Sequence, residues 1–244
     1  MEEKLNGKVI VITGASSGIG NAIAKRLALS QATIVMFGGR NQEKLFSAKD
    51  EIIKQGGKCL AISGNLTDSN FIDNGIKKIL NEYGKIDILI NNAGSAFSSP
   101  FTSVTEKQFD EIMELDVKVP FFLTQKMLPY LKKSNYATII NIASIVGHLG
   151  YPLQSAYSMA KHALLGFTKS LANEVYKDGV RVHAISPGGV YTDMVKLTRP
   201  DLKPEDVILP EDVAESVAFL LNNRNSAVID EIIIHRVGKA PFGV

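Results

Sequence analysis

Residues 8–28 read KVIVITGASSGIGNAIAKRLA, and this stretch decides the fold. An apolar run rich in Val and Ile leads into a turn that contains Gly14, Gly18 and Gly20, and a helical pattern follows. Glycine lets a backbone turn sharply and approach a ligand, and a helix N-terminus offers free N–H groups to an anion. The spacing G-x-x-x-G-x-G differs from the commoner G-x-G-x-x-G fingerprint, and ordinary turns also use glycine. The stretch therefore predicts a strand, a phosphate-binding turn and a helix.

The rest of the chain repeats this alternation of short apolar runs and longer helical patterns. The runs mostly lack alternating polar residues, which is typical of strands buried on both faces of a parallel sheet. They cover residues 8–13, 33–37, 59–62, 86–91, 137–143, 180–186 and 228–235. The helical patterns cover residues 18–30, 42–55, 68–83, 105–132, 155–177 and 211–222. Repeated strand–helix units predict an α/β fold of three layers, doubly wound around a parallel sheet of about seven strands. Ligands of such folds bind at the carboxyl ends of the strands.

Composition narrows the classes of function. The 244 residues are 45% apolar, which suffices for one buried core and predicts a single domain over residues 1–244. The 27 basic and 25 acidic residues are spread along the chain, so nucleic-acid binding has little support. No apolar run reaches the ~18 residues of a membrane span, so we expect no membrane partner.

Three further features bear on the compartment and on metals. The N-terminus, MEEKLNG, does not resemble a signal peptide. A single cysteine, Cys59, cannot form an internal disulfide, which fits a reducing compartment. We therefore expect a cytoplasmic protein. The four histidines show no metal-ligand spacing, so we predict no metal.

The end of the second predicted strand distinguishes between dinucleotides. It reads VMFGGRNQEK, and Gly39 takes the position where an acidic residue would hydrogen-bond the ribose 2′-hydroxyl of NAD. Arg40 follows, and a guanidinium can hold a 2′-phosphate in a fork. This favours NADP(H) over NAD(H). An ordinary surface role for Arg40 stays open, and Glu43 is a weaker candidate for the ribose.

The helical stretch SAYSMAKHALLGFTKSLANEV, residues 155–175, places Tyr157 and Lys161 four residues apart. On a helix they stand one turn apart on the same face. Taken alone, the pair is most often a surface tyrosine beside a solvated lysine. The remaining motifs change that interpretation.

Five motifs in order resemble the short-chain dehydrogenase/reductase family of single-domain type. The glycine turn gives T-G-x-x-x-G-x-G at residues 13–20, and N-N-A-G follows the fourth predicted strand at residues 91–94. A serine, Ser144, follows the fifth strand, Y-x-x-x-K follows at residues 157–161, and P-G-x-x-x-T at residues 187–192. Within the family the chain most resembles 3-oxoacyl-[acyl-carrier-protein] reductases and related NADPH-dependent carbonyl reductases. The resemblance implies a Rossmann fold.

The resemblance also implies catalytic roles. Tyr157 is the expected general acid in reduction and base in oxidation, and Ser144 orients the substrate oxygen. Phenols ionise near pH 10, and a nearby ammonium favours the phenolate, so Lys161 would assist while also binding the nicotinamide ribose. The fourth catalytic position of the family, often an Asn, is Asp116 here. An Asp keeps the backbone carbonyl but loses the amide donors, and its carboxylate could pair with Lys161 or stay protonated.

The expected cofactor residues come from the glycine turn, the segments after the second, third, fourth and sixth predicted strands, and the Tyr–Lys pair. They are Gly14, Ser16, Ser17, Gly18, Ile19, Gly20, Gly39, Arg40, Asn65, Leu66, Asn92, Ala93, Gly94, Tyr157, Lys161, Pro187, Gly188, Val190 and Thr192. Asn65 stands where many relatives carry an Asp that contacts adenine, and an amide can replace one such hydrogen bond.

The expected substrate pocket is mostly apolar, and a short lid at about 190–209 would cover it. The candidate walls are Ala96, Phe97, Val146, His148, Leu149, Leu153 and Met194. Pro200 and Pro204 limit any helix in the lid, which suggests an open pocket. His148 could contact a polar substrate, but an ordinary loop histidine is the more common case.

The leading hypothesis is an NADPH-dependent oxidoreductase that reduces a ketone, either a 3-oxoacyl thioester or a small carbonyl compound, to a secondary alcohol. One alternative is an alcohol or hydroxy-acid dehydrogenase working oxidatively. Another, motivated by Asp116, is an NADPH-binding regulatory protein with little turnover. A homodimer or homotetramer through helices 105–132 and 155–177 is a family expectation, although the C-terminus, DEIIIHRVGKAPFGV, is atypical.

Overall fold

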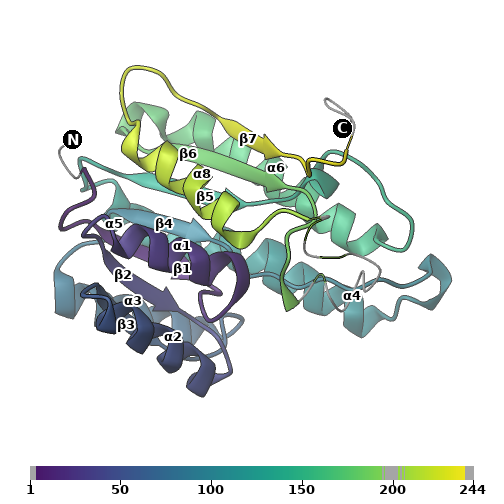
Figure 1. The fold of residues 1–244 in the computed structure, drawn as a ribbon, viewed down its shortest axis with the longest axis horizontal. Helices are drawn as coiled ribbons and strands as arrows, with labels where there is room; N and C mark the ends of the chain where they lie inside the picture. The colour runs from purple at the N-terminus through teal and green to yellow at the C-terminus, as the bar shows by residue number, and fades with distance from the viewer. Residues whose placement is uncertain (1–3, 194, 196–202, 204, 206, 240–244) are drawn as a thin grey trace.

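The computed structural model of the chain describes residues 4–193, 195, 203, 205 and 207–239. Seven parallel strands form one sheet in the order β3-β2-β1-β4-β5-β6-β7. Figure 1 shows β3 towards one edge and β7 at the other. The strands are β1 Val9–Thr13, β2 Thr33–Phe37, β3 Lys58–Ile62, β4 Ile88–Asn91, β5 Thr138–Ile142, β6 Arg181–Pro187 and β7 Glu231–Ile234. The predicted parallel sheet and doubly wound α/β class are confirmed.

Helices cover both faces of the sheet, and each face has its own apolar core. The α-helices are α1 Gly18–Ala28, α2 Gln42–Lys54, α3 Ser69–Tyr83, α4 Glu106–Met113, α5 Val119–Leu131, α6 Ser155–Val175 and α8 Pro210–Asn222. Side chains of α1, α2 and α8 fill one core, and those of α3, α5 and α6 fill the other. Figure 1 shows α1 and α8 side by side on one face. Along β1, Ile10 and Ile12 point into the first core while Val9 and Val11 point into the second, which explains the uninterrupted apolar run.

The strand order reverses at β1, because β2 follows on one side and β4 lies on the other. The end of β1 is tied to the segment after β4 by hydrogen bonds. Thr13 Oγ1 accepts the backbone N–H groups of Asn92, at 2.9 Å, and Ala93, at 3.0 Å. Asn92 Nδ2 donates to the Thr13 carbonyl at 2.9 Å. The topological switch point therefore brings the glycine turn against the N-N-A-G segment, where doubly wound folds bind ligands.

The long helix expected at 105–132 contains a π-helical turn, Glu114–Lys118, between α4 and α5. Its start agrees with the sequence pattern: Thr105 and Gln108 form the capping box. The π turn was not expected, and it is centred on Asp116, whose side chain is buried. Such single turns are rare and often mark functional sites. The last strand is also shorter than expected, Glu231–Ile234 instead of 228–235.

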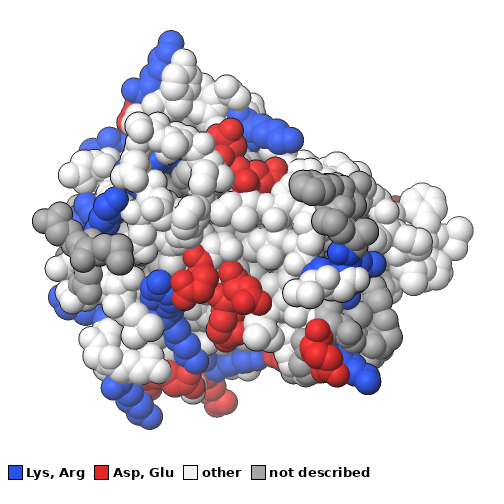
Figure 2. All heavy atoms as spheres, turned by 45° about the horizontal axis from the view of Figure 1, so that its top comes forward, with Lys and Arg blue, Asp and Glu red and all other residues white. Residues whose placement is uncertain are grey.

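Three short 3₁₀ turns also occur in the described residues. They are η1 Phe101–Ser103, η3 Ile145–Gly147 and η4 Tyr176–Asp178. On the face shown in Figure 2, basic and acidic side chains lie interspersed over a largely uncharged surface. Within the described ranges, no helix has the length and apolar character needed to cross a membrane.

Candidate active site

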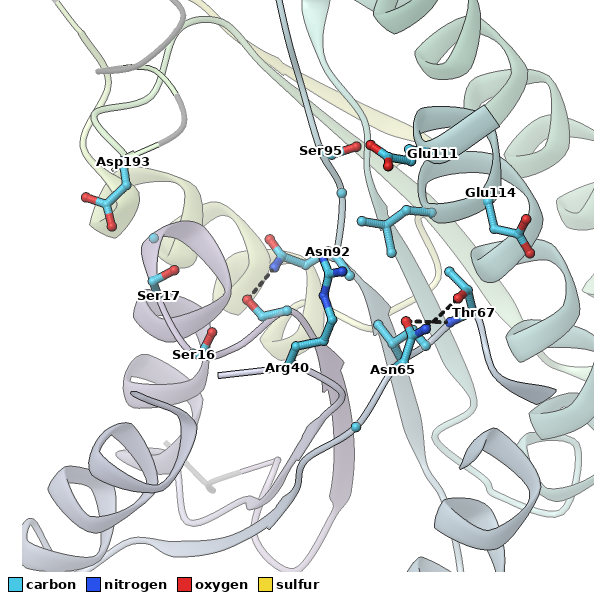
Figure 3. Close-up of a pocket in the computed structure, with 18 of the residues that line it drawn as sticks. Ser16, Ser17, Arg40, Asn65, Thr67, Asn92, Ser95, Glu111, Glu114 and Asp193 are labelled. Atoms are coloured by element: carbon cyan, nitrogen blue, oxygen red, sulfur yellow. Dashed lines mark hydrogen bonds between the residues drawn. The ribbon is translucent and has the colours of Figure 1, made fainter. Parts of the chain in front are cut away.

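A cavity of about 890 Å³ lies at the carboxyl edge of the sheet, at the switch point. Its floor is the glycine turn with the N-N-A-G segment, and one wall is the exposed face of α4. Figure 3 shows Arg40 reaching into this pocket between the Ser16–Ser17 turn and Asn65, with Glu111 and Glu114 on the far side. The pocket has the size of a small-molecule or cofactor site.

Crowding requires glycine at the floor of this pocket. Gly14 has φ +65°, and a Cβ there would lie 2.8 Å from the Ala93 Cα. A Cβ on Gly20 would lie 2.4 Å from Asn92 Nδ2 and 2.5 Å from the Gly14 carbonyl oxygen. These approaches are closer than any side chain tolerates, so the glycines let β1, α1 and the N-N-A-G segment meet.

The N-terminus of α1 opens into the same pocket. Its N-cap residue is Ser17, whose side chain makes no capping hydrogen bond, and its first turn carries no acidic residue. The first N–H groups of this helix therefore stay available to an outside acceptor. Free N–H groups and the positive end of the helix dipole suit a phosphate. Together with the glycine floor and the cavity volume, this turn fits the pyrophosphate of a dinucleotide.

The end of β2 supplies a cation and no carboxylate. Gly38 and Gly39 both have positive φ, +86° and +103°, and Arg40 follows with an exposed side chain that lines the pocket. The next cation along the chain, Lys44, is already paired with Asp193 at 3.1 Å. Arg40 is therefore well placed to meet an anionic group at this end of the pocket.

Asn65 lines the pocket, but its amide is used locally. Its Oδ1 accepts the Thr67 N–H at 3.2 Å and its Nδ2 donates to Thr67 Oγ1 at 2.7 Å, as Figure 3 shows. Both atoms of the Asn65 amide are therefore already engaged in an Asx turn. An adenine contact by this amide would have to share or replace these hydrogen bonds.

Tyr157 and Lys161 occupy the first two turns of α6, as their spacing predicts. The Lys161 Nζ lies 5.6 Å from the centre of the Tyr157 ring. Lys161 is buried, and its Nζ donates to the Ile142 carbonyl at the end of β5, at 3.3 Å. Tyr157 is only partly buried. The helix thus holds a fixed ammonium beneath a phenol that solvent or substrate can reach.

Ser144 lies directly after β5, on a segment packed tightly against α6. Its Oγ accepts the Val146 N–H at 3.2 Å and donates to the Pro187 carbonyl at 3.3 Å. Ser158, the neighbour of Tyr157, donates to the Val146 carbonyl at 3.1 Å. A Cβ on Gly147 would lie 3.0 Å from the Lys161 carbonyl oxygen, so only glycine permits this approach. These contacts hold the Ser144 turn beside the helix that carries Tyr157 and Lys161.

Asp116 completes the cluster from the π turn. Its Oδ2 lies 3.2 Å from Lys161 Nζ, an ion pair between two buried groups that is not aligned as a hydrogen bond. Its Oδ1 accepts the Ser95 N–H at 2.7 Å. Burial raises the pKa of Asp116, and Lys161 and the Ser95 hydrogen bonds act against that rise. Burial acts most strongly, to lower the pKa of Lys161, but the Asp116 carboxylate and Tyr157 together outweigh it, so the pKa of Lys161 is raised.

The family described as short chain dehydrogenase matches residues 8–203 of the chain. This chain belongs to the short-chain dehydrogenase family. It is 35% identical over 241 residues to the 3-oxoacyl-[acyl-carrier-protein] reductase of Aquifex aeolicus, covering 96% of this chain and 97% of that protein. Short-chain dehydrogenases are oxidoreductases, and the prediction of an enzyme of this family is confirmed.

Solved short-chain dehydrogenases share the fold. A metagenomic short-chain oxidoreductase in complex with NADP superposes with a TM-score of 0.83 at 30% identity, covering 97% of this chain and 100% of its own. The 3-ketoacyl-(acyl-carrier-protein) reductase of Brucella melitensis, complexed with NADH, gives 0.86 at 28% identity, with 95% and 97% coverage. These likenesses agree with the seven-stranded parallel sheet and its two layers of helices.

Most of the dinucleotide-binding residues expected of this short-chain dehydrogenase line the pocket. They are Gly14, Ser16, Ser17, Gly18, Ile19, Gly39, Arg40, Asn65, Leu66, Asn92, Ala93, Gly94 and Thr192. Gly20 lies beneath the floor against Asn92. Pro187, Gly188 and Val190 lie at and after the end of β6. These three residues, and Tyr157 and Lys161 on α6, are not among the lining residues, and their contact with a cofactor stays a prediction.

The sequence patterns did not identify the α4 wall of the pocket. It comprises Glu106, Lys107, Asp110, Glu111, Glu114 and Leu115, and further lining residues are Gly64, Thr67, Ser95 and Asp193. The polar residues recur on one helical face, which has the same pattern as a solvated surface. Only the folded chain shows that this face borders a cavity.

The expected substrate walls are spread over the two loops beside α6. Phe97 packs with Tyr157 against Ala156 and Ala160. The Leu153 carbonyl accepts the Ser99 N–H at 2.9 Å and so joins the two loops. Ala96 is half-buried and Val146 is buried, and the Leu149 carbonyl accepts a hydrogen bond from Ser158.

His148 is held from the edge of the sheet, since its Nε2 lies 2.7 Å from Glu231 Oε1 on β7. Met194 and much of the expected lid lie outside the described residues. Within the described part of the chain, no three His, Cys, Asp or Glu side chains gather closely enough to hold a metal ion.

Proposed function

We propose that this short-chain dehydrogenase uses NADPH to reduce a ketone, a 3-oxoacyl thioester or a small carbonyl compound, to a secondary alcohol. The observation that carries the proposal is the arrangement on α6: a partly exposed phenol with a buried ammonium 5.6 Å from its ring, beside the Ser144 turn. A carbonyl oxygen that gains electron density needs a proton donor and a hydrogen-bond donor. Tyr157 would provide the first, and the Ser144 hydroxyl, which donates to the Pro187 carbonyl at 3.3 Å, would turn to provide the second.

Separate residues of the chain would bind the cofactor, orient the substrate and transfer the proton. The glycine turn and the α1 N-terminus hold the pyrophosphate, and Arg40 binds the 2′-phosphate. NADPH, when bound, supplies the hydride. Ser144 hydrogen-bonds the substrate oxygen and orients it, and Tyr157 donates the proton to the same atom. Lys161 holds positive charge beneath the phenol and has a donor left for the ribose.

The preference for a ketone substrate draws on three observations. Phe97 and Tyr157 pack against the same buried cluster, which contains Ala156 and Ala160, and the expected loop walls are mainly apolar in sequence. The family relative from Aquifex aeolicus is named a 3-oxoacyl-[acyl-carrier-protein] reductase.

The whole chain, residues 1–244, would act as one dinucleotide-binding domain with a short lid at about 190–209. Thioester and small ketone share the carbonyl that Ser144 and Tyr157 would bind.

A coenzyme-oxidation assay tests the proposal. Purified protein would be given NADPH with an acetoacetyl thioester and with a panel of diketones, and loss of NADPH absorbance would be followed. Tyr157→Phe should lower kcat by about 10²- to 10⁴-fold, because the proton donor is lost while the ring remains. Tyr151→Phe, an exposed neighbour in the preceding loop, is the matched control and should keep wild-type activity.

The outcomes separate the alternatives. Turnover that survives in Tyr157→Phe would exclude the proposed acid. Oxidation of secondary alcohols with NADP⁺ that is much faster than ketone reduction would favour an alcohol or hydroxy-acid dehydrogenase working oxidatively. Tight NADPH binding without turnover of any carbonyl or alcohol would favour a nucleotide-binding regulatory protein.

Self-assembly forms part of the same proposal. Phe121 and Phe122 on α5 and Met159 on α6 are all more than two-fifths exposed, and the Phe121 ring lies 5.2 Å from that of Phe167. Exposed apolar side chains on neighbouring helices are typical of protein interfaces. A homodimer or homotetramer through α5 and α6 would bury them. Light scattering after size exclusion would measure the assembly.

A further inference from the structure

Asp116 occupies the position where many family members carry an Asn, and its carboxylate is fully enclosed. Its side chain is 0% exposed. Oδ1 accepts the Ser95 N–H at 2.7 Å and lies 3.3 Å from Ser95 Oγ, and Oδ2 lies 3.2 Å from Lys161 Nζ. Gly94 makes room for this contact, because a Cβ there would lie 2.7 Å from Asp116 Oδ2. The carboxylate is therefore built into the junction of the cofactor pocket with the Tyr–Lys helix.

Lys161 is held by groups from two elements outside its own helix. Its Nζ donates to the Ile142 carbonyl at the end of β5, at 3.3 Å, and forms an ion pair at 3.2 Å with the Asp116 carboxylate on the π turn. Within the described chain, the titratable groups whose charge acts on Lys161 are Asp116 and Tyr157. The titratable group whose charge acts on Asp116 is Lys161. The balance of charge beneath the phenol thus depends on one carboxylate and one ammonium.

We infer that Asp116 is a positioning residue that fixes Lys161 and offsets its charge beneath the Tyr157 phenol, so that the site favours carbonyl reduction. This inference rests on the proposed function of Tyr157 as the proton donor. It assigns to the Asp116 carboxylate an effect that an Asn at the same position cannot have, since an amide carries no charge.

The sign of the effect follows from electrostatics. A lone ammonium beneath a phenol favours the phenolate, which is the form that removes a proton in alcohol oxidation. A carboxylate 3.2 Å from that ammonium removes most of the net charge seen by the phenol. Removing the carboxylate restores the charge. In a buried site, one uncompensated charge a few ångströms away moves a titration by about one pH unit or more.

The test compares Asp116→Asn with wild type and with Asp73→Asn. The amide has nearly the shape of the carboxylate, so the fold should survive. Asp73 forms a half-buried ion pair with Lys126 at 2.5 Å, on α3 and α5, and its variant makes the same chemical change in a second Asp–Lys pair. Asp116→Ser, a smaller neutral side chain that leaves room for a water, gives the same comparison if the amide variant does not fold.

Two readouts follow. The first is the pH profile of ketone reduction and of alcohol oxidation. The second needs neither cofactor nor turnover: phenolate absorbance of the apoprotein during alkaline titration, with the Tyr157→Phe titration subtracted. The chain has seven tyrosines and no tryptophan, so the difference isolates one phenol against a simple background.

In Asp116→Asn we expect the phenolate of Tyr157 to appear about one pH unit lower than in wild type. The pH at which the reduction rate falls on the alkaline side should decrease by the same amount. The ratio of the oxidation rate to the reduction rate at neutral pH should rise several-fold. At acid pH the rates of variant and wild type should become equal. Asp73→Asn should match wild type throughout. Superimposable titrations of folded Asp116→Asn and wild type would overturn the inference, as would a loss of rate that is equal at every pH.

The absorbance readout separates this inference from the proposed function. If wild type reduces no carbonyl but the phenolate still moves in Asp116→Asn, the charge balance is as inferred and the reaction is different. If wild type is an active reductase and the phenolate does not move, the proposed function stands and the role of Asp116 is wrong.

Discussion

Replacing Arg40 with alanine should weaken NADPH binding and leave NADH binding nearly unchanged. Arg40 follows Gly38 and Gly39 at the end of β2, extends into the pocket (Figure 3), and meets no acidic residue at that strand end. NADPH and NADH differ only by the 2′-phosphate. A guanidinium that binds this group contributes to one coenzyme and not to the other.

The size of the effect follows from the exposure of Arg40. A hydrogen bond to a charged group is worth about 1.5 to 3 kcal/mol net, and an exposed pair is weakened by solvent and salt. We therefore expect a loss of about 1 to 2 kcal/mol, which corresponds to about a 5- to 30-fold rise in the Kd for NADPH. The kcat should change little, because the phosphate interaction is the same in the ground state and the transition state.

The assay is a cycle of two proteins and two coenzymes. The Kd for NADPH and for NADH would be measured by titration of coenzyme fluorescence in wild type and Arg40→Ala, and KM would be compared in the reductase assay. Lys54→Ala is the matched control, because it removes the same charge from an exposed position at the far end of α2. The coupling between the side chain and the 2′-phosphate is the difference of the differences.

Two results would refute this reasoning. If Arg40→Ala raises the dissociation constants for NADPH and NADH by the same factor, the guanidinium does not bind the 2′-phosphate. If Lys54→Ala has as large an effect on NADPH, the preference comes from overall charge and not from a contact at Arg40.

Three further variants test the site, the core and the surface. Gly20→Ala would place a Cβ 2.4 Å from Asn92 Nδ2, so NADPH affinity should fall at least about tenfold, as a binding titration would show; unchanged affinity would contradict the crowded floor. Although burial acts to raise it, hydrogen bonds and Lys85 hold the pKa of Asp87 below its ordinary value. Its contribution is therefore present above the unfolded pKa and lost as pH falls through the folded pKa, so Asp87→Asn should cost about 2 kcal/mol in urea unfolding at pH 7 and much less near pH 3. A constant difference across that range would count against this account. Phe121→Ser should shift the assembly towards monomer in light scattering if α5 forms an interface, and an unchanged mass would exclude that interface.

Much of the fold was predictable because its causes are local. Ile10 and Val11 belong to a run that is apolar at every position, and such a run indicates a strand covered on both faces. The capping box of Thr105 and Gln108 marks the start of α4 within four residues of sequence. The three glycines after β1 needed no partner from elsewhere to indicate a sharp turn at a helix N-terminus.

The parts of the site that were missed or left open depend on contacts between distant segments. The pairing of Asp116 with Lys161 was one of two alternatives from the sequence, and only the fold brings the two together across 45 positions; the π turn that carries Asp116 has no signature in its own residues. The acidic face of α4 has the composition of a solvated surface, yet it borders the pocket at the switch point. Asn65 is occupied by Thr67, two residues away, which depends on the conformation of the loop.

The sequence by itself determined the order of strands and helices, the sharp glycine turn at the start of α1, and the spacing that places Tyr157 one turn from Lys161. These features follow from backbone geometry within a few residues, which is the same wherever the segment lies. Only the tertiary structure decided that a carboxylate sits against the lysine and that Ser144 lies packed beside the same helix. The physical reason is that these contacts exist only after the sheet has brought the ends of β4, β5 and β6 together, and no local spacing encodes that distance.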